Sequence, residues 1–564
     1  MAPLHAASTA ARAPPAWPLQ SLSRALLLPA LLLLAAAPRA ADAAFSVSNV
    51  FDSRMVLQRD APALAVWGRA DAGTNVSLEL QPAPGAGQPA RFAALADASG
   101  DWVITLGARA GSLSPYTLVF TTPLPEGTSV YLSDVLFGDV YLSLGQSNAQ
   151  IPVSYVLNAT AEVAAALLPQ YANVRTFQAD RTAWSFSPQA QLQAPPDSTW
   201  GPPNAWSIGG FSAVGWLTAR YLTDALNGTI ALGVVSLNWG ATSIQSWSSP
   251  AACAACGGCP PSYNGWVPPG PTHPGNTSVL WNSMFLPYAA AAAVRGGGGG
   301  GGGGAFPITG ATWYQGEDNA QAGQADYYAC ALPALVASLR GLFGSPQAWV
   351  GVVQLGPWAG PPAVNDGAAG VRQAQLLGVA GDPRVVTVTA ADGGDPLAPQ
   401  VIHSRRKQLV ARRLAAAALS VVYGVGDLSP AVGPVYAAAT ARAAVGTTVT
   451  VEVSFAPGTT AGGLVLVPPT PGNSSTYCPT DEGVPADNCG WFAVQTSDGA
   501  WRNATAALGG PAGDRLVLAV DTAPATGLAA VATSSGWALW PVLPLRNLAG
   551  LPAFPWRHNV SAAA

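Results

Sequence analysis

The arrangement of hydrophobic and polar positions divides the chain into three stretches. From Phe45 to about Val130, short segments of alternating polarity, such as 75–80 (NVSLEL) and 101–106 (DWVITL), are separated by Gly and Pro. Alternation with a period of two is typical of strands that bury one face. The first stretch is therefore predicted to be a small all-β domain.

Near-continuous apolar runs mark the middle of the chain, as expected of strands that are buried on both faces. Helical patterns lie between the runs at 214–227 and 328–343, and another helix is expected after His403, ending at Tyr423. Strands that alternate with helices predict a parallel sheet in a three-layer α/β domain. The apolar runs are 135–144, 230–237, 308–314, 348–355 and 384–390.

Alternating polarity returns after about residue 430, for example in 447–455 (TTVTVEVSF). The 564 residues are too many for one hydrophobic core, so several domains are expected. Nine consecutive glycines at 296–304 predict a flexible surface insertion. The predicted parts are a leader at 1–43, an N-terminal β domain at 44–133, an α/β domain at 134–427 and a C-terminal β domain at 428–564.

Residues 1–43 have the features of a secretory signal peptide. Arg12 and Arg24 supply positive charge, 25–37 is an apolar run, and 41–43 (ADA) fits the small-x-small cleavage rule. The run is shorter than the roughly 20 residues that span a bilayer, so no membrane segment is expected after cleavage. The predicted location is the secretory pathway, outside the cell or in a lumen like that of a lysosome or vacuole.

Sequons, charge and cysteines agree with export and narrow the class of protein. The net charge of −4 argues against a nucleic acid or an anionic membrane as partner.

Cys253, Cys256 and Cys259 would suggest a metal cluster in the cytosol, but in an oxidising compartment we expect disulfides. Cys478 and Cys489 flank a loop that a disulfide could close. N-x-S/T sequons, which predict a glycoprotein, begin at Asn75, Asn158, Asn227, Asn276, Asn473, Asn503 and Asn559.

A serine and a histidine are candidates for nucleophilic catalysis. In 142–150 (LSLGQSNAQ) a buried strand ends before a glycine, which places Ser147 at the carboxyl edge of the sheet. His403, between a polar loop and an amphipathic helix, is the best-placed base. The other histidines lie in the leader, in a Pro/Gly-rich stretch and near the C-terminus, at His5, His273 and His558.

Five sequence blocks occur in a fixed order. They are 135–150 (VLFGDVYLSLGQSNAQ), 238–249 (NWGATSIQSWSS), 278–287 (SVLWNSMFLP), 312–319 (TWYQGEDN) and 402–415 (IHSRRKQLVARRLA). Together they resemble the sialate O-acetylesterase family of the SGNH-hydrolase superfamily. The resemblance continues at 55–68, 212–222 and 551–556 and so covers nearly the whole chain after the leader. It implies a three-layer SGNH-hydrolase (flavodoxin-like) domain between two β domains, and a serine esterase that removes O-acetyl groups from sugars without a metal or organic cofactor.

The resemblance implies roles for matching residues. Ser147 would be the nucleophile, and its backbone N–H would join that of Gly240 in the oxyanion hole. A side-chain amide would be the third donor, with Gln315 as the first choice and Asn319 as the second. Glu317 would orient its neighbours rather than react.

The residues around the histidine depart from the family pattern. His403 would be the general base, with activity rising with pH through the ordinary pKa of a histidine. Ser404 replaces the usual proline, and Gln400 stands where many members carry the acid of the triad. Asp395 is therefore the predicted orienting acid, with Asp392 as the alternative. A backbone carbonyl or a water could also accept from the second ring nitrogen.

Two rival hypotheses remain at this point. An esterase acting on acetylated xylan or other cell-wall polysaccharide would share all of these residues. A glycan-binding protein without catalysis would share the fold, and labelling of Ser147 by a fluorophosphonate would distinguish it from an esterase.

Overall fold

The computed structural model describes residues 45–123, 128–261, 275–290, 306–442, 444–511 and 513–561. The leader, the glycine run at 296–304, His5 and His273 lie outside these residues, and so do the predictions made for them. In the described part of the chain, no helix has both the length and the apolar character needed to cross a membrane.

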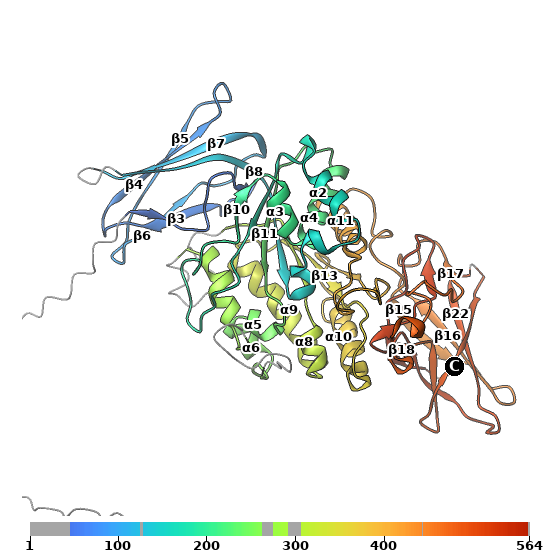
Figure 1. The fold of residues 1–564 in the computed structure, drawn as a ribbon. Helices are drawn as coiled ribbons and strands as arrows, with labels where there is room; N and C mark the ends of the chain where they lie inside the picture. Colours follow the sequence, from blue (N-terminus) through green and yellow to red (C-terminus); the bar gives the residue numbers. More distant parts are fainter. Residues whose placement is uncertain are drawn as a thin grey trace, which may run out of the picture. The chain divides into compact units, whose positions relative to one another are not determined.

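One long strand, β8 (Ser129–Gly145), joins the N-terminal strands to the central sheet (Figure 1). Its N-terminal part pairs antiparallel with β7 (Ser112–Thr121) and parallel with β2 (Val56–Gln58). Its C-terminal part lies between two parallel neighbours, β11 (Leu232–Asn238) and β12 (Gly310–Tyr314). The predicted domain boundary at 133/134 therefore falls inside a strand.

The central sheet confirms the α/β class, although it is mixed rather than purely parallel. Its strands are ordered β10-β9-β11-β8-β12-β13-β14, and all but β10 are parallel to their neighbours in this series. All five predicted apolar runs form strands of this sheet. The strands not yet given are β9 (Val174–Gln178), β10 (Ser198–Gly201), β13 (Trp349–Gln354) and β14 (Val385–Thr389).

The predicted helices are present and lie on both sides of β8. α4 (Ala213–Ala225) packs on α11 (Lys407–Tyr423), which ends at Gly424 in the left-handed conformation. The hydroxyl groups of Tyr423 and Tyr141 are 2.9 Å apart, which ties the end of α11 to one face of β8.

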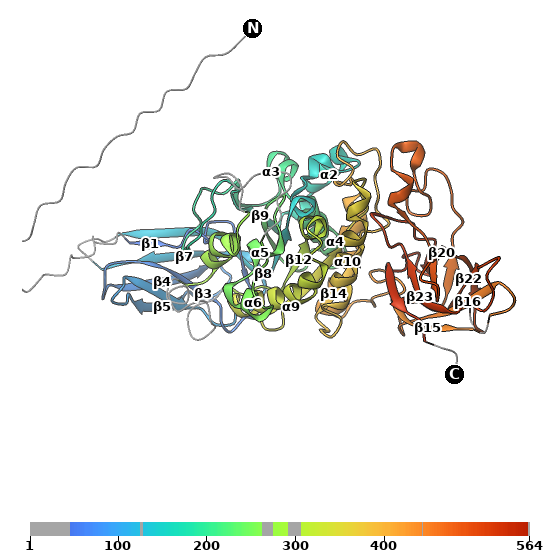
Figure 2. The ribbon, with the colours of Figure 1, turned by 90° about the horizontal axis from the view of Figure 1, so that it is seen from below.

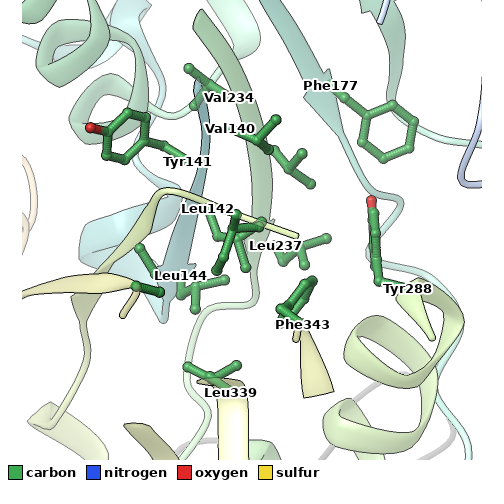
Figure 3. Packing of buried hydrophobic residues seen from close by; sticks show 14 of the residues in the cluster. Val140, Tyr141, Leu142, Leu144, Phe177, Val234, Leu237, Tyr288, Leu339 and Phe343 are labelled. Carbon is green, nitrogen blue, oxygen red and sulfur yellow. The ribbon is translucent and has the colours of Figure 1, made fainter. Parts of the chain in front are cut away.

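The opposite face of β8 packs on a different helix. Because side chains alternate along a strand, Leu142 and Leu144 point away from Tyr141. Figure 3 shows them beside Leu339 of α9 (Ala325–Leu342) and Phe343, which directly follows this helix. A further helix that packs on α9, α10 (Asn365–Leu377), was not predicted.

The N-terminal β region consists of short strands in two sheets. A three-stranded sheet has the order β1-β3-β6, and β4, β5 and β7 connect to the central sheet through β8. The all-β character predicted for this region is confirmed. The remaining strands are β1 (Ser46–Val47), β3 (Ala65–Arg69), β4 (Asn75–Pro82), β5 (Ala90–Leu95) and β6 (Asp101–Thr105).

The C-terminal region is also made of strands, several of which are labelled in Figure 2. Two four-stranded sheets, ordered β15-β16-β22-β21 and β20-β19-β23-β26, enclose a separate hydrophobic core that includes Val451, Leu518 and Trp556. The β character predicted after residue 430 is thus confirmed. The strands are β15 (Tyr436–Ala441), β16 (Thr448–Phe455), β19 (Ala493–Thr496), β20 (Trp501–Asn503), β21 (Thr505–Gly509), β22 (Arg515–Asp521), β23 (Ala530–Ser535) and β26 (Trp556–Asn559).

All six cysteines form disulfides, which confirms the disulfide interpretation of the C-x-x-C-x-x-C run. Cys253 pairs with Cys259, and Cys256 pairs with Cys330 in α9. Cys478 pairs with Cys489 and closes the loop between them, as predicted.

Candidate active site

The carboxyl ends of three neighbouring strands bring together the turns that carry the candidate residues. Gly145 at the end of β8 lies opposite Asn238 of β11 and Tyr314 of β12. After β8, the chain adds β9 and β11 on one side of this strand and later β12, β13 and β14 on the other side. Open α/β sheets bind ligands at the point where the strand order reverses in this way. Ser147 begins the short helix α1 (Ser147–Gln150) immediately after this edge.

Gly145 makes the turn before Ser147 possible. Its φ is +132°, in a region that L side chains rarely adopt, and a Cβ atom there would lie 2.1 Å from the carbonyl oxygen of Tyr314. The backbone N–H of Gln146 donates to that same oxygen at 3.1 Å. This close backbone approach fixes Ser147 beside the turn that follows β12.

A cavity of about 1090 Å³ opens at this edge of the sheet. Ser147 and His403, which are separated by more than 250 positions in the sequence, both line it. Further lining residues that matter for its chemistry are Gln146, Gly240, Glu317 and Asp318. The structure therefore brings the predicted nucleophile, base and oxyanion-hole glycine to one cavity.

His403 lies in the loop between β14 and α11. Its backbone N–H donates to the carbonyl of Gln400 at 2.8 Å. Burial, together with the nearby ammonium group of Lys407, lowers the pKa of His403 from its ordinary value to about 4. The neutral, proton-accepting imidazole is therefore favoured over a wide pH range. His558 lies elsewhere, in β26, stacked on Tyr436.

The two predicted orienting acids, Asp395 and Asp392, both pair with arginines. Asp395 accepts from the Nε and Nη2 of Arg405 at 2.6 and 2.9 Å. Asp392 accepts from both terminal nitrogens of Arg413 at 2.6 and 2.8 Å. Burial opposes ionisation of both carboxyls, but these guanidinium groups prevail and lower the pKa of each. Among the described residues, the His403 ring makes no hydrogen bond or ion pair with either carboxylate.

The two amides expected to complete the oxyanion hole also lie elsewhere. Gln315 is fully buried, and its Nε2 donates to Gln146, to the carbonyl of Thr242 and to Asn319 at 2.9–3.1 Å. Asn319 is fully buried too. Its Nδ2 donates to the side-chain oxygens of two further glutamines, at 2.8 and 2.9 Å. Neither residue lines the cavity, because the buried amide network behind it uses their donors.

Gly240 lies beside Ser147 in the cavity. An ideal Cβ on Gly240 would lie 3.2 Å from the Oε1 of Gln150 and 3.4 Å from the Cβ of Ser147, so Gly240 lies directly beside both residues. Its backbone N–H donates to the Oε1 of Gln150 at 2.7 Å. The donor is thus aimed into the cavity region but is occupied by a side chain in this structure.

Glu317 belongs to a buried polar chain that the sequence analysis recognised only in part. Its Oε1 accepts from the Nδ2 of Asn148 at 2.5 Å, and Asn148 also donates to the carbonyl of Ile402 at 3.0 Å. The Nζ of Lys407 donates to the Oδ1 of Asn148. Burial raises the pKa of Glu317 and lowers that of Lys407 to about 7. Asn148 and Lys407 were missed, although both stand inside the blocks that carry the family resemblance.

Asp318 is a second carboxyl that the sequence analysis did not single out. It lines the cavity, and burial together with the neighbouring Glu317 raises its pKa to about 7. Its Oδ2 is buried and has no hydrogen-bond partner within the described residues. A carboxyl of this kind can hydrogen-bond a sugar hydroxyl in either protonation state.

Comparison with known proteins gives a consistent picture. The family described as carbohydrate esterase, sialic acid-specific acetylesterase, matches residues 137–420. The sialate O-acetylesterase of Rattus norvegicus is 31% identical over 71% of this chain and 77% of its own length. That of Homo sapiens is 30% identical over 72% of this chain and 75% of its own length.

One solved structure is similar along most of the chain. It is XAC1771, described as a novel carbohydrate acetylesterase from Xanthomonas citri. The TM-score is 0.69 at 25% identity, and the match covers 91% of this chain and 99% of that one. The similarity extends beyond the central sheet.

Proposed function

Because the chain belongs to the carbohydrate esterase family of sialic acid-specific acetylesterases, and is a carboxylic ester hydrolase acting on acetylated sugars, we propose that Ser147 and His403 hydrolyse O-acetyl esters of sialic acids. The observation that carries this proposal is the shared cavity. Ser147, His403 and Gly240 line it together, although they come from turns far apart in the sequence.

The mechanism follows from these positions. His403 accepts the hydroxyl proton of Ser147 while the Oγ attacks the acetyl carbonyl carbon. The backbone N–H groups of Ser147 and Gly240 stabilise the oxyanion once Gln150 releases the latter. His403 then protonates the departing sugar oxygen, and water hydrolyses the acetyl-enzyme with the same base. Since Asp395 and Asp392 are occupied by arginines, we propose a Ser147–His403 dyad.

The charges around the cavity bear on the sugar. Glu317, Asp318 and Arg181 line it, and Arg181 is paired with Asp197, with 2.5 Å between the Nη2 and Oδ2 atoms. A sialic acid carries a carboxylate that a guanidinium would bind, but Asp197 competes for this one. The second candidate, hydrolysis of acetate from a neutral polysaccharide such as acetylated xylan, is favoured by this pairing and by the two carboxyls.

A substrate panel on the purified protein tests both candidates. Acetate release from O-acetylated sialic acid and from acetylated xylan is compared at equal enzyme concentration, with Ser147→Ala as the blank. If sialate is the substrate, Arg181→Ala raises KM for sialate and leaves the xylan reaction unchanged. Release of acetate from neither substrate, with no fluorophosphonate label on Ser147, would contradict the proposal and favour a glycan-binding protein.

The organisation of the chain is part of the same proposal. We propose that 134–427 has the three-layer SGNH-hydrolase arrangement and is flanked by β domains at 44–133 and 428–564. The three disulfides and the sequons support a place in the secretory pathway, outside the cell or in its lumenal compartments. Residues 1–43 would be the cleaved signal peptide.

A further inference from the structure

We infer that the side-chain amide of Gln146, the residue directly before the nucleophile, is the third donor of the oxyanion hole. The inference rests on the proposed esterase function and completes it. The amides expected in this role, those of Gln315 and Asn319, are buried behind the cavity wall with their donors in use. Gln146 lines the cavity itself.

The orientation of the Gln146 amide is set by three donors. Its Oε1 accepts from the Nε2 of Gln315 at 3.1 Å and from the backbone N–H groups of Gly316 and Asp318 at 3.3 and 3.4 Å. A backbone N–H can only donate, so the oxygen end of the amide must face this turn. The Nε2 end then points away from the turn that follows β12.

That Nε2 group is available for a ligand. Within the described residues the Nε2 makes no hydrogen bond, although only 3% of the surface of Gln146 is exposed. A donor in so confined a place loses free energy unless an acceptor is supplied. Since Gln146 lines the cavity next to Ser147, the acetyl oxygen of a bound ester is an acceptor in reach of both residues.

The same contacts explain the buried amide network. Gln315 is held by Thr242, Asn319 and Gln375, whose Nε2 donates to its carbonyl at 2.8 Å. Gln315 in turn holds the oxygen of Gln146. Gln315 is thus a positioning residue, and Gln146 is the group that touches the reacting atoms. A preorganised donor of this kind costs no rearrangement when the charge develops.

The acylation of Ser147 needs no reactant besides the bound ester. The Ser147 Oγ forms a bond to the acetyl carbon, its proton passes to the His403 imidazole, and the carbonyl electron pair moves onto the oxygen. The N–H groups of Ser147, Gly240 and Gln146 share that negative charge. When the bond to the sugar oxygen breaks, the carbonyl reforms and the proton leaves with the sugar.

The test is Gln146→Glu in the full-length protein, because a carboxylate keeps the acceptor for Gly316 and Asp318 but removes the donor. Loss of one oxyanion donor lowers kcat by about 10²- to 10³-fold, and KM should change much less. Gln347→Glu, on an exposed loop outside the cavity, adds the same charge and should keep wild-type kcat. The kcat of Gln146→Glu should recover as pH falls, since the protonated carboxyl can donate again.

Two outcomes separate this inference from the function on which it rests. If Ser147→Ala is inactive and Gln146→Glu keeps kcat within about threefold of the wild type, the role of Gln146 is overturned while the esterase stands. If Ser147→Ala keeps its activity, the proposed function fails and the role of Gln146 falls with it. If Gln146→Glu fails to fold and is inactive at every pH, a second variant, Gln315→Leu, tests the inference. That variant removes one of the three donors that hold the Gln146 oxygen, so the amide is held less firmly and kcat should also fall; an unchanged kcat would overturn the inference.

Discussion

The Nζ of Lys407 donates a hydrogen bond to the Oδ1 of Asn148, with 2.5 Å between the two atoms. Asn148 directly follows the proposed nucleophile, and Lys407 begins the helix that follows the proposed base. Through Asn148, the same contact reaches Glu317 and the carbonyl of Ile402. One buried chain of polar groups therefore joins the three turns that form the cavity.

Lys407 should control the pH at which the enzyme loses activity in acid. His403 must be neutral to accept a proton. Burial first, and then the Lys407 ammonium, disfavour the imidazolium, so the pKa of His403 lies near 4. The wild-type kcat/KM should therefore hold down to about pH 5 and fall below it. In Lys407→Met the pKa of His403 rises, and the acidic limb of the profile moves to higher pH.

The control for this shift is Arg412→Met, which removes a positive charge from the exposed side of the same helix. Its profile should coincide with that of the wild type. A wild-type limb at the ordinary histidine pKa, or a limb that Lys407→Met leaves in place or moves to lower pH, would contradict the electrostatic account.

Gln150 should act as a competitor of the substrate. Its Oε1 occupies the Gly240 N–H, which the oxyanion must receive. A hydrogen bond of this kind is worth about 0.5–1.5 kcal/mol, so Gln150→Ala should raise kcat/KM by about two- to tenfold. Steady-state kinetics on one acetylated sugar measure this. A tenfold decrease would instead mean that Gln150 itself assists the reaction.

Asp395→Asn should have a modest effect on catalysis. The carboxylate is bound to Arg405 and does not touch the His403 ring, so its neutralisation should lower kcat by less than about tenfold, through a looser loop. Neutralising the aspartate of a working triad costs about 10⁴-fold. A loss of that size at neutral pH would restore Asp395 as the orienting acid.

Gly145→Ala should destabilise the protein rather than alter the chemistry directly. The new methyl group would lie 2.1 Å from the Tyr314 carbonyl oxygen, at a φ of +132°. We expect a loss of more than about 3 kcal/mol in the free energy of unfolding. Gly107→Ala is the control, because its φ is +68° but no atom lies near the new Cβ, and its cost should be about 1 kcal/mol. Equal losses in urea denaturation would argue against the close backbone approach.

The sequence was informative where burial alone decides structure. The apolar runs that became β8, β11, β12, β13 and β14 are continuous, and α11 ends at a glycine that adopts the left-handed conformation. Strand β9 was missed because three of its five residues, Arg175, Thr176 and Gln178, are polar and yet buried. Arg175 is compensated by Asp134, a partner 41 positions earlier that no local pattern reveals.

The direction of a side chain was the part of the site that sequence could not supply. Asp392 and Asp395 follow β14 as expected, but Arg413 and Arg405 return along the chain to bind them. Gln315 and Asn319 stand in the expected block, yet their amides face the buried network. These outcomes depend on which partner lies across the fold, and spacing along the chain does not contain that information.

The central claim is that Ser147 performs the chemistry with His403, and one measurement tests it most directly. Hydrolysis of an O-acetylated sugar is compared between the wild type and Ser147→Ala, with thermal unfolding as the check that both are folded. The account predicts an unchanged Tm and a loss of turnover of about 10³-fold or more. A folded Ser147→Ala variant that keeps more than about a tenth of the wild-type turnover would contradict it.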